Sequence, residues 1–394
     1  MAKKDLPIIV AGGGIGGLAA AHALARKGRA VHVLEAAPVF GEVGAGIQLG
    51  PNVFKMFDYL GLTEVIDKTA VYPDNLIMHD ALSGEQLIKV PVGSAAFRNK
   101  YKFPYGVIHR ADIHGAFLEA CQKSPLVTLS ASQKVVGFDD KGDHVAVNTE
   151  SGASFEGELL IGCDGLWSKV RSQIVGDGKP RVSGHIAYRA VIPTPKVPAH
   201  LQQKNVVLWG GPKTHLVHYP LRRGEVYNLV VVFHSSRYEE GWDTYGDPAE
   251  LHERFQGQGP EVLEFLAMVN AWKMWVLCDR EPIKGWSKGR AVLLGDAAHP
   301  MLQYLAQGAC MATEDAVVLA NQLEAKKGDH QAAFQAYEKE RYLRTARVQL
   351  TARFYGEVYH ATDVRRDLRN SLLKAATPEG AMNGPSWLYE GIPV

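Results

Sequence analysis

The sequence has few cysteines and almost no net charge, and each scarcity excludes a class of protein. Its 394 residues include four cysteines, Cys121, Cys163, Cys278 and Cys310, and none of them forms a C-x-x-C pair. This spacing predicts neither a zinc site nor a redox dithiol, and it favours buried, reduced thiols. Lys and Arg total 43 against 42 Asp and Glu, a formal charge of +1, so we expect no nucleic-acid binding.

Long apolar runs are also missing. None reaches the roughly 18 residues that a membrane-spanning helix needs. The chain begins Met-Ala-Lys-Lys-Asp, but the apolar stretch that follows is short and ends in glycines, unlike a secretory signal. We therefore expect a cytoplasmic protein with no membrane span.

Glycine, by contrast, is above its usual share, with 40 residues that gather in clusters. The first cluster follows an apolar, β-branched run at residues 6–11. A helical stretch at 18–26 comes next, and a second apolar run at 30–34 ends at Glu35. This order predicts a strand, a glycine turn, a helix and a second strand.

Gly12, Gly14 and Gly17 fit the G-x-G-x-x-G fingerprint of dinucleotide-binding folds. The first glycine permits the tight turn, the second lets a pyrophosphate approach the backbone, and the third lets helix and strand pack closely. The pyrophosphate would lie on the free amides of the helix N-terminus, and Glu35 would accept hydrogen bonds from ribose hydroxyls. The fingerprint alone does not distinguish NAD from FAD.

Two later segments each end a predicted buried strand with an Asp beside a Gly. Residues 158–171 read ELLIGCDGLWSKVR, and residues 290–300 read RAVLLGDAAHP. At such turns the backbone can approach a ligand. The carboxylates of Asp164 and Asp296 can then accept hydrogen bonds from sugar-alcohol hydroxyls.

Together, the fingerprint and these two segments resemble the signatures of single-component FAD-dependent aromatic hydroxylases, the group that includes salicylate hydroxylase and para-hydroxybenzoate hydroxylase. The resemblance extends from Ile8 to about Arg353. It implies non-covalent FAD, NADH as a transient reductant, O2, a small aromatic substrate and no metal ion. It also implies an α/β fold with a Rossmann-type FAD-binding domain, an inserted β-rich substrate domain and a C-terminal helix. The expected FAD-binding domain comprises residues 1–75, 100–180 and 285–330, the substrate domain 76–99 and 181–284, and the C-terminal helical segment 331–394.

The same resemblance implies which residues contact FAD. Asp296 would bind the ribityl chain, Arg110 the ribityl or phosphate portion, and Asp164 with Gly165 would support both FAD and NAD(P)H. A loop at 41–52 would face the isoalloxazine ring, and the amides of 305–309 would bind its pyrimidine edge, where a side chain on residue 308 would collide with the ring. Arg110 could instead pair with Asp112 at the surface, and Gln48 could be an exposed loop residue. The full expected set is Gly12, Gly14, Gly17, Glu35, Ala45, Gly46, Gln48, Arg110, Asp164, Gly165, Asp296, Pro300, Gly308 and Ala309.

The region between the motifs predicts the substrate layer. Residues 181–193 and 205–233 are rich in β-branched and aromatic residues around turn signals, which predicts a mostly antiparallel sheet. In the strand from Thr214, the residues His215, Val217 and Tyr219 share one face, and Leu216 and His218 share the other. We expect one of these faces to form the floor of an aromatic pocket.

A narrower resemblance, carried by Gln303 and the loop 44–52, is to the 3-hydroxybenzoate 6-hydroxylase branch, which forms gentisate. It implies substrate contacts by His215, Tyr219, Gln303 and Tyr105. His215 would be the base for the phenol, because its unperturbed pKa lies near neutrality. Tyr219 would share the proton, and Gln303 would orient the substrate through its amide. A His and a Tyr on one strand face can also be packing residues.

The expected function is NADH-dependent hydroxylation of 3-hydroxybenzoate para to its hydroxyl. Within the class, the alternative is decarboxylative hydroxylation of salicylate or 6-hydroxynicotinate. Outside it, the alternative is an FAD oxidase or a flavin-binding sensor. The single fingerprint and the absence of a cysteine pair disfavour a reductase with separate FAD and NAD(P)H domains.

Residues 331–359 predict one long amphipathic helix. We expect it to pack on the FAD-binding domain, or, as a second possibility, to form a subunit interface, so the protein would be a monomer or a homodimer. Arg341, Arg344 and Arg347 are expected away from its apolar face. That face is expected to contain Phe334, Tyr337, Leu343, Ala346, Leu350, Phe354 and Val358.

Overall fold

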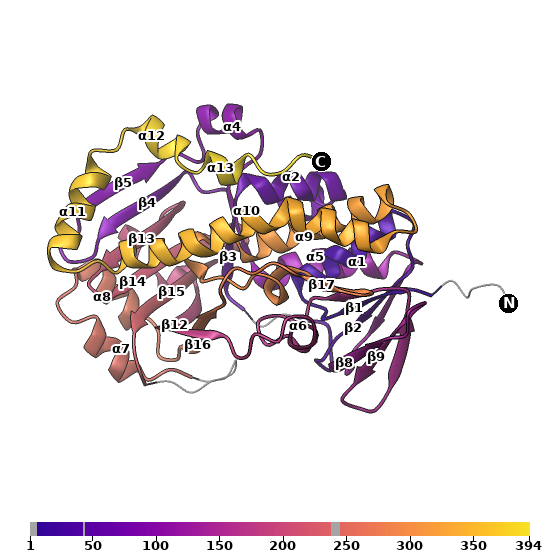
Figure 1. Ribbon diagram of the computed structural model, residues 1–394. Coiled ribbons are helices and arrows are strands. Elements are labelled where there is room, and N and C mark those ends of the chain that lie inside the picture. Colours follow the sequence, from indigo (N-terminus) through magenta and orange to yellow (C-terminus); the bar gives the residue numbers. More distant parts are fainter. Residues whose placement is uncertain (1–5, 42–43, 238–244) are drawn as a thin grey trace.

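Two sheets and one long helix organise the computed structural model, which describes residues 6–41, 44–237 and 245–394. In Figure 1 the sheet that begins the chain lies at one end of the molecule and a larger sheet at the other, and α10 (His330–Tyr359) runs alongside both. The expected α/β fold class is confirmed. Residues 1–5, which carried the expectation of no signal sequence, and residues 42–43 of the predicted flavin loop lie outside the described residues.

The fingerprint follows the first strand of a six-stranded, mainly parallel sheet. β1 (Ile8–Ala11) pairs in parallel with both β2 (Val31–Leu34) and β11 (Leu160–Gly162). All residues of β1 are buried, because helices α1, α5 and α9 cover one face of the sheet and a small antiparallel sheet covers the other (Figure 1). The sheet is completed by β7 (Val127–Ser130), β17 (Ser287–Lys288) and β18 (Ala291–Leu293), and its covering elements are α1 (Ile15–Arg26), α5 (Arg110–Gln122), α9 (Gly308–Ala325), β8 (Val135–Asp140), β9 (Val145–Thr149) and β10 (Ser154–Gly157).

The three motif segments meet because β1, β11 and β18 are neighbouring strands. Ala11 pairs with Gly162, and Gly162 pairs with Leu293, all in parallel register. Gly12, Asp164 and Asp296 therefore follow adjacent strand ends. Open parallel sheets bind ligands at this edge.

The second sheet has seven strands and is mostly antiparallel, as predicted. One face packs on α7 (Pro248–Arg254) and α8 (Pro260–Ala267), and the other faces α10 and the turn before α9. The only parallel pair in this sheet joins β4 to β13, so residues 75–90 lie beside strands that come more than a hundred residues later. The strand order is β16 (Lys273–Asp279), β12 (Arg181–Pro193), β15 (Val226–His234), β14 (Thr214–Leu221), β13 (Asn205–Gly211), β4 (Asn75–Asp80) and β5 (Gln86–Val90).

The shorter elements close the gaps between the sheets. A two-stranded ribbon of β3 (Gly46–Leu49) and β6 (Gly106–His109) lies between them.

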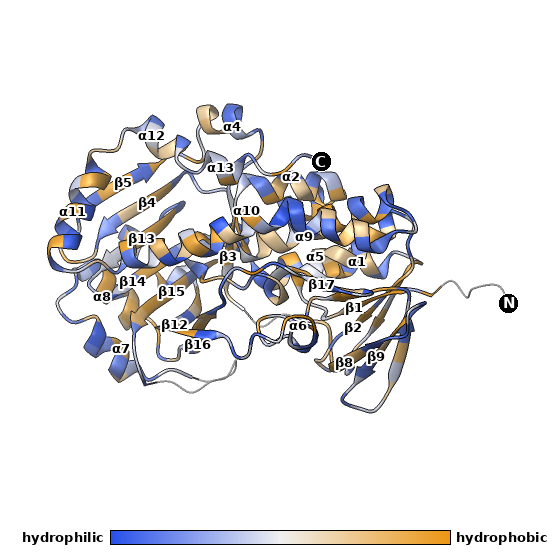
Figure 2. Ribbon diagram, in the orientation of Figure 1, coloured by the Kyte–Doolittle hydropathy of each residue, from blue (hydrophilic) through white to orange (hydrophobic). Residues whose placement is uncertain are grey.

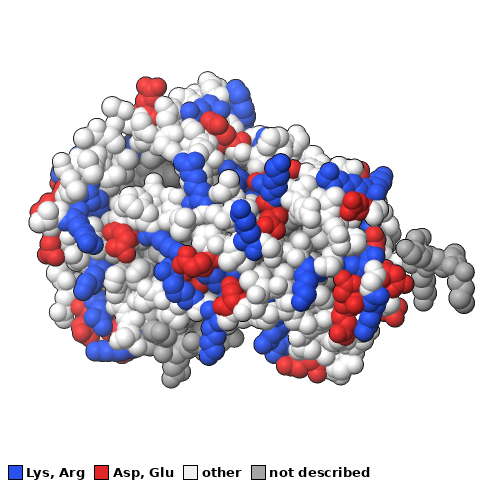
Figure 3. Space-filling view, viewed as in Figure 1, with Lys and Arg blue, Asp and Glu red and all other residues white. Residues whose placement is uncertain are grey.

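In the described parts of the chain no helix has the length and apolar character needed to cross a membrane. Both signs of charge are interspersed on the face drawn in Figure 3. The remaining helices are α2 (Pro51–Leu60), α3 (Thr63–Asp67), α4 (Ala95–Tyr101), α6 (Lys169–Ile174), α11 (Asp363–Lys374), α12 (Pro378–Asn383) and α13 (Ser386–Tyr389).

The long helix was predicted correctly, but the apolar face assigned to it was partly wrong. Polar and apolar segments alternate along α10 in Figure 2. Leu343, Leu350 and Phe354 are 74%, 50% and 63% exposed, whereas Arg341 is completely buried. A pattern that counts only apolar residues places arginine outside. Here, acidic groups on the neighbouring helix neutralise Arg341.

Arg341 is the centre of a buried ion-pair network between α10 and α9. Its guanidinium donates to Glu314 at 2.5 Å and to Asp315 at 2.6 Å, and all three side chains are fully buried. Asp315 also contacts His299 Nε2 at 2.5 Å and accepts a hydrogen bond from the Gly295 amide at 3.1 Å. The network therefore fixes the turn after β18 to the two longest helices.

We predict that Arg341→Met destabilises the protein by about 3–5 kcal/mol, because the buried Asp315 loses its arginine partner, while Glu314 keeps its ion pair with Arg344. Urea unfolding of the apoprotein measures the loss. Lys339→Met, at an exposed position on the same helix, is the matched control and should stay within about 0.5 kcal/mol of the parent protein. Equal stability of the Arg341 variant and the parent would contradict the role assigned to the network.

Candidate active site

The glycine turn after β1 is as tight as the fingerprint predicts. Gly12 has φ +105°, and a Cβ there would lie 2.4 Å from the Cys163 carbonyl oxygen. A Cβ on Gly17 would lie 1.9 Å from the Gly12 carbonyl oxygen, so a larger residue would force helix and strand apart. α1 begins after Gly14 with no side chain capping its amides, which leaves them available to a pyrophosphate.

The Glu35 carboxylate faces this turn from the end of β2. It accepts hydrogen bonds from the amides of Gly13 at 2.6 Å and Ala37 at 2.7 Å. Buried His114 holds the turn from the other side, with Nε2 lying 2.8 Å from the Gly13 carbonyl oxygen. Sequence reasoning missed His114, because a lone histidine within a helix belongs to no motif.

The turn after β18 is held by side chains from distant parts of the chain. Buried Arg171 donates to the carbonyl oxygens of Ala297 at 2.9 Å and Ala298 at 2.7 Å. Gln349 of α10 donates to the carbonyl oxygen of Pro300 at 3.0 Å. Pro300 thus contributes to the shape of the turn through its backbone, and its expected contact with FAD stays a prediction.

Asp296 lies in the turn after β18. Its side chain is exposed although the neighbouring residues of the turn are buried. The surrounding protein raises the pKa of Asp296, while nearby His299 and Arg110 lower it. An accessible carboxylate among buried residues fits the ribityl chain of FAD, whose hydroxyls are hydrogen-bond donors.

Asp164 has a structural task in this fold. Its carboxylate accepts hydrogen bonds from the Ser168 hydroxyl and from the amides of Lys169 at 2.7 Å and Val170 at 3.1 Å, so it caps α6. Burial raises the pKa of Asp164, and these hydrogen bonds lower it. Gly165 follows with φ +73°, which favours glycine. Contact of either residue with a nucleotide stays a prediction.

The predicted flavin loop continues into β3. The Gly46 amide donates to Asn228 Oδ1 at 2.7 Å, and a Cβ on Gly46 would come within 2.6 Å of the Tyr219 ring. The Tyr105 hydroxyl donates to Gln48 Oε1 at 2.6 Å. Gln48 is therefore a half-buried strand residue next to a proposed substrate contact, and not an exposed loop glutamine.

Arg110 begins α5 beside this loop. Its amide donates to the Ala45 carbonyl oxygen at 3.1 Å, and a Cβ on Gly44 would lie 3.1 Å from its Cδ. Asp112 forms its ion pair with Arg222 at 2.9 Å. Arg110 thus lies close both to this loop and to Asp296.

α9 begins at Gly308 without a side-chain cap, so its first amides are available to an acceptor. A Cβ on Gly308 would meet no atom nearer than Asp296 Oδ1, at 3.9 Å. The protein itself therefore leaves room beside Gly308. The half-buried Ala309 follows in the same first turn of α9. A helix N-terminus in this position stabilises negative charge, which suits the pyrimidine edge of a reduced flavin.

The second sheet presents one polar face to the turn before α9. His215 pairs with Val232, and Val232 pairs with Ala187, so the odd-numbered residues of β14 and β12 share a face with the even-numbered residues of β15. The opposite face, with Leu216 and His218, packs on α7 and α8 as the predicted alternation requires. The polar face contains His185, Arg189, His215, Tyr219 and His234.

Gln303 lies against this polar face from the turn before α9. Its Oε1 accepts a hydrogen bond from the Arg189 guanidinium. Tyr105, Tyr219 and Tyr304 belong to one buried cluster with residues of the same face. Sequence reasoning missed Arg189 and Tyr304, because neither lies in a recognisable motif.

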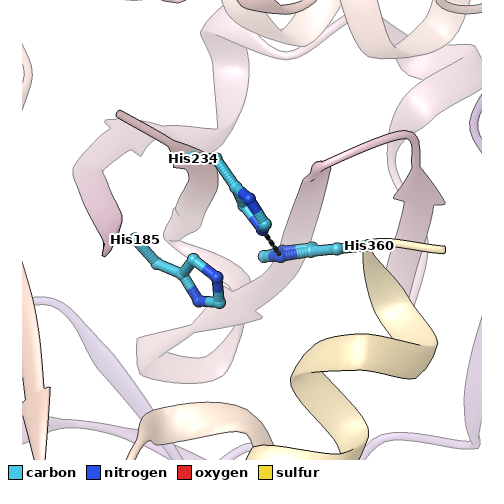
Figure 4. Close-up of side chains that lie close together, drawn as sticks. All are labelled: His185, His234 and His360. Atoms are coloured by element: carbon cyan, nitrogen blue, oxygen red, sulfur yellow. Dashed lines mark hydrogen bonds between the residues drawn. The ribbon is translucent and has the colours of Figure 1, made fainter. Parts of the chain in front are cut away.

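A histidine chain leads away from His215. The Nδ1 atom of His215 lies 2.7 Å from His360 Nε2, and the Nδ1 atom of His360 lies 2.9 Å from His234 Nε2. Figure 4 shows His360, from the end of α10, meeting His185 and His234 of the sheet. Ring nitrogens of these three residues lie within 4.8 Å of one another, a spacing that a metal ion could use and that the sequence did not predict. Because both nitrogens of His360 are engaged, we interpret the group as a hydrogen-bonded chain.

Burial changes the basicity of His215 from that of a free imidazole, and its expected role as the base for the phenol stays a prediction. The side chain is only 3% exposed. Burial lowers the pKa of His215 to about 3, with a further contribution from His185. The imidazole is thus neutral at neutral pH, where it accepts a hydrogen bond but is a weak base. Burial also raises the pKa of Tyr219, which stays a protonated phenol.

Comparison with known proteins identifies the family. The family model described as FAD binding domain matches residues 5–352. The chain is 48% identical over 385 residues to 3-hydroxybenzoate 6-hydroxylase of Polaromonas naphthalenivorans, covering 98% of this chain and 96% of the relative. It is 36% identical over 351 residues to 6-hydroxynicotinate 3-monooxygenase of Bordetella bronchiseptica, covering 87% and 89%. The solved structure of Klebsiella pneumoniae HpxO complexed with FAD and uric acid matches with a TM-score of 0.87 and 27% identity, covering 98% and 97%.

We predict that Gly308→Ala lowers the affinity for FAD about tenfold or more, because the new methyl group would enter space that the flavin requires. The free energy of unfolding of the apoprotein should change by less than about 1 kcal/mol, since no protein atom is close. Equilibrium titration of apoprotein with FAD measures the affinity. Gly115→Ala, on α5 with open space around it, controls for alanine in a helix. FAD binding by the Gly308 variant equal to that of the control would show that the flavin lies elsewhere.

The buried histidines predict acid sensitivity. Burial lowers the pKa values of His215 and His218 to about 3, whereas each has a pKa near 6.5 in the unfolded chain. Below pH 6.5 the unfolded chain therefore binds protons that the folded protein does not, and stability falls as pH falls. Between pH 7.5 and 5.5 each such histidine should remove up to about 1.4 kcal/mol. Urea unfolding at the two pH values tests this, and a His218→Gln variant with an undiminished pH dependence would contradict it.

Proposed function

The chain belongs to the FAD-binding family of flavoprotein monooxygenases, and from that premise we propose that it uses NADH and O2 to hydroxylate 3-hydroxybenzoate to gentisate. The observation that carries this proposal is the 48% identity to a 3-hydroxybenzoate 6-hydroxylase along nearly the whole chain. The polar face of the second sheet supports it, because His215 offers a hydrogen-bond acceptor and Tyr219 a phenol, beside the turn before α9. In this proposal the first sheet belongs to the FAD-binding domain and the second to the substrate domain.

When bound, FAD takes the hydride of NADH and activates O2 for transfer to the aromatic ring. The chain would hold FAD through the α1 amides and Glu35 at the adenosine end, Asp296 at the ribityl chain, and the first amides of α9 at the pyrimidine edge. The remaining task of the protein is to orient the substrate and to move its phenolic proton.

His215 is placed for that proton. Its Nδ1 is engaged with His360, so Nε2 is the nitrogen left for the phenol. A base with a low pKa cannot ionise a free phenol to any large extent. As the ring accepts oxygen para to its hydroxyl, however, that hydroxyl becomes the protonated carbonyl of a dienone, which is far more acidic. A neutral imidazole suffices at that stage, and the resulting positive charge is shared with His360 through Nδ1.

The other proposed substrate residues orient the ring. Tyr219 keeps its proton at neutral pH and can donate a hydrogen bond. The Gln303 oxygen is taken by Arg189, so the amide nitrogen is the group available to the substrate. Tyr105 acts through its hydrogen bond to Gln48. These roles make the four residues one positioning set around the ring.

A second substrate class has specific support. The 36% identity to a 6-hydroxynicotinate 3-monooxygenase favours decarboxylative hydroxylation as the alternative.

We also propose that the enzyme is cytoplasmic, where NADH is available, and that it forms a homodimer. The exposed apolar residues Leu343, Leu350 and Phe354 of α10 are spaced seven and four residues apart, on one side of the helix, which supports a subunit contact.

The proposal predicts that the FAD-loaded enzyme, given NADH, air and 3-hydroxybenzoate, forms gentisate with one product molecule for each NADH consumed. Chromatography of products from 3-hydroxybenzoate, salicylate and 6-hydroxynicotinate, with oxygen-electrode measurement of O2 uptake, provides the test. Decarboxylated products from the latter two, and none from 3-hydroxybenzoate, would establish the alternative. Hydrogen peroxide as the only product from every substrate would indicate an oxidase.

The same assay includes His215→Gln. This variant should bind FAD and be reduced by NADH normally, while hydroxylation falls about 10²- to 10⁴-fold, because only the latter needs the proton acceptor. His218→Gln is the matched control, since His218 is equally buried on the other face of the same strand. Product yields that are equal in the His215 variant and the control would contradict the assignment.

A further inference from the structure

Arg189 is a half-buried cation on the polar face whose function the FAD site does not explain. It lies on β12 opposite Val230, on the same face as His215 and Tyr219. Its guanidinium lies over the Trp275 ring at 5.4 Å and donates to Gln303 Oε1. Its Nε is buried and has no hydrogen-bond partner. Nη2 thus donates a hydrogen bond to the protein, whereas Nε, on the same edge of the guanidinium, is without a partner.

The charge of Arg189 also lacks compensation. Among the described residues no carboxylate forms an ion pair with it, and the charged group that influences it is another cation, Arg110. Burial lowers the pKa of Arg189 to about 10, so it stays charged at neutral pH. A buried charge without a partner is costly, and a guanidinium matches a carboxylate through two parallel hydrogen bonds. The site is therefore electrostatically complete only with an anion.

The position of Arg189 relative to His215 defines the shape of that anion. The two residues are separated by two strand spacings, about 10 Å, and by two residues along the strands, about 7 Å. Both side chains extend from the same face of the sheet, and the Arg189 guanidinium lies on the β16 side of its strand, over Trp275. An aromatic ring that has a hydroxyl and a carboxylate on different carbons can offer one group to each residue.

We propose that Arg189 binds the carboxylate of an aromatic acid substrate through Nε and its terminal nitrogen, and thereby makes the enzyme select hydroxybenzoates over neutral phenols. This inference rests on the proposed function and names the residue that determines its substrate class. Gln303 bonds to Arg189 and presents its amide nitrogen to the same substrate. The ring is then fixed at both ends, with the hydroxyl at His215 and the carboxylate at Arg189.

Binding measurements test the inference without any need for turnover. Oxidised holoenzyme is titrated with 3-hydroxybenzoate and with 3-hydroxybenzamide, its neutral analogue of nearly the same shape, and the change in flavin absorbance is followed. The parent protein should prefer the acid by about 30-fold or more, the effect expected of a buried charge pair. Arg189→Gln should lose that preference and change the affinity for the amide less than threefold. Arg189→Lys should keep part of the preference, because it keeps the charge but loses the planar fork.

Arg181→Gln is the matched control. Arg181 lies on the same strand but is exposed, and it pairs with Asp279 at 2.9 Å. It should leave both affinities within twofold of those of the parent. FAD content and thermal unfolding are measured for each variant. If Arg189→Gln does not retain FAD, the acid-to-amide ratios of the parent and of Arg189→Lys still decide the question.

The inference is overturned if the parent protein binds acid and amide equally, or if Arg189→Gln keeps the parent's ratio. Failure of the proposed function gives a different result. Acid binding that depends on Arg189, without formation of gentisate, would leave Arg189 as a carboxylate site and remove the assigned reaction. Normal gentisate formation with an unchanged ratio in Arg189→Gln would retain the reaction and remove the carboxylate site.

Discussion

The buried pairing of Arg341 with Glu314 and Asp315 is the interaction on which the rest of the site depends. Burying three charged groups is favourable only if each finds its partners at close range, so the geometry of α9 and α10 is tightly constrained. Asp315 extends this constraint to Gly295 and His299. The turn that presents Asp296, and the N-terminus of α9 behind Gly308, are therefore positioned by electrostatics as well as by apolar packing.

The same long helix links that constraint to the second sheet. α10 contributes Arg341, which contacts Asp315, and Gln349, which contacts the Pro300 carbonyl in the turn after β18. His360 follows the last turn of α10 and contacts His215. One rigid element thus fixes the distance between the part of the protein that would hold the flavin and the part that would hold the substrate. Oxygen transfer between two bound molecules requires such a fixed distance.

The fold and the turns at which FAD is proposed to bind could be predicted from the sequence because their signals are local. Gly12, Gly17 and Asp296 lie in short segments where strand, turn and helix follow one another, and parallel pairing then brings the strand ends together. The partners that hold these turns could not be predicted. His114, Arg171 and Gln349 act over more than a hundred residues or from within helices, and Arg341 has the charge that a periodicity argument places outside.

The proposed substrate half shows a different limit, because burial changes the acid–base properties of residues whose shared strand face was predicted correctly. Strand alternation placed His215 and Tyr219 on one face, yet burial makes the first a weak base and the second a persistent donor. Neutral histidines cannot balance Arg189, and Arg110 adds to its positive charge. The polar face therefore has a net positive potential in an apolar setting, where charge interactions are strong. An aromatic acid neutralises that potential and supplies a phenol to an acceptor that becomes effective only as the ring is oxidised, so binding and proton transfer both favour the same class of molecule.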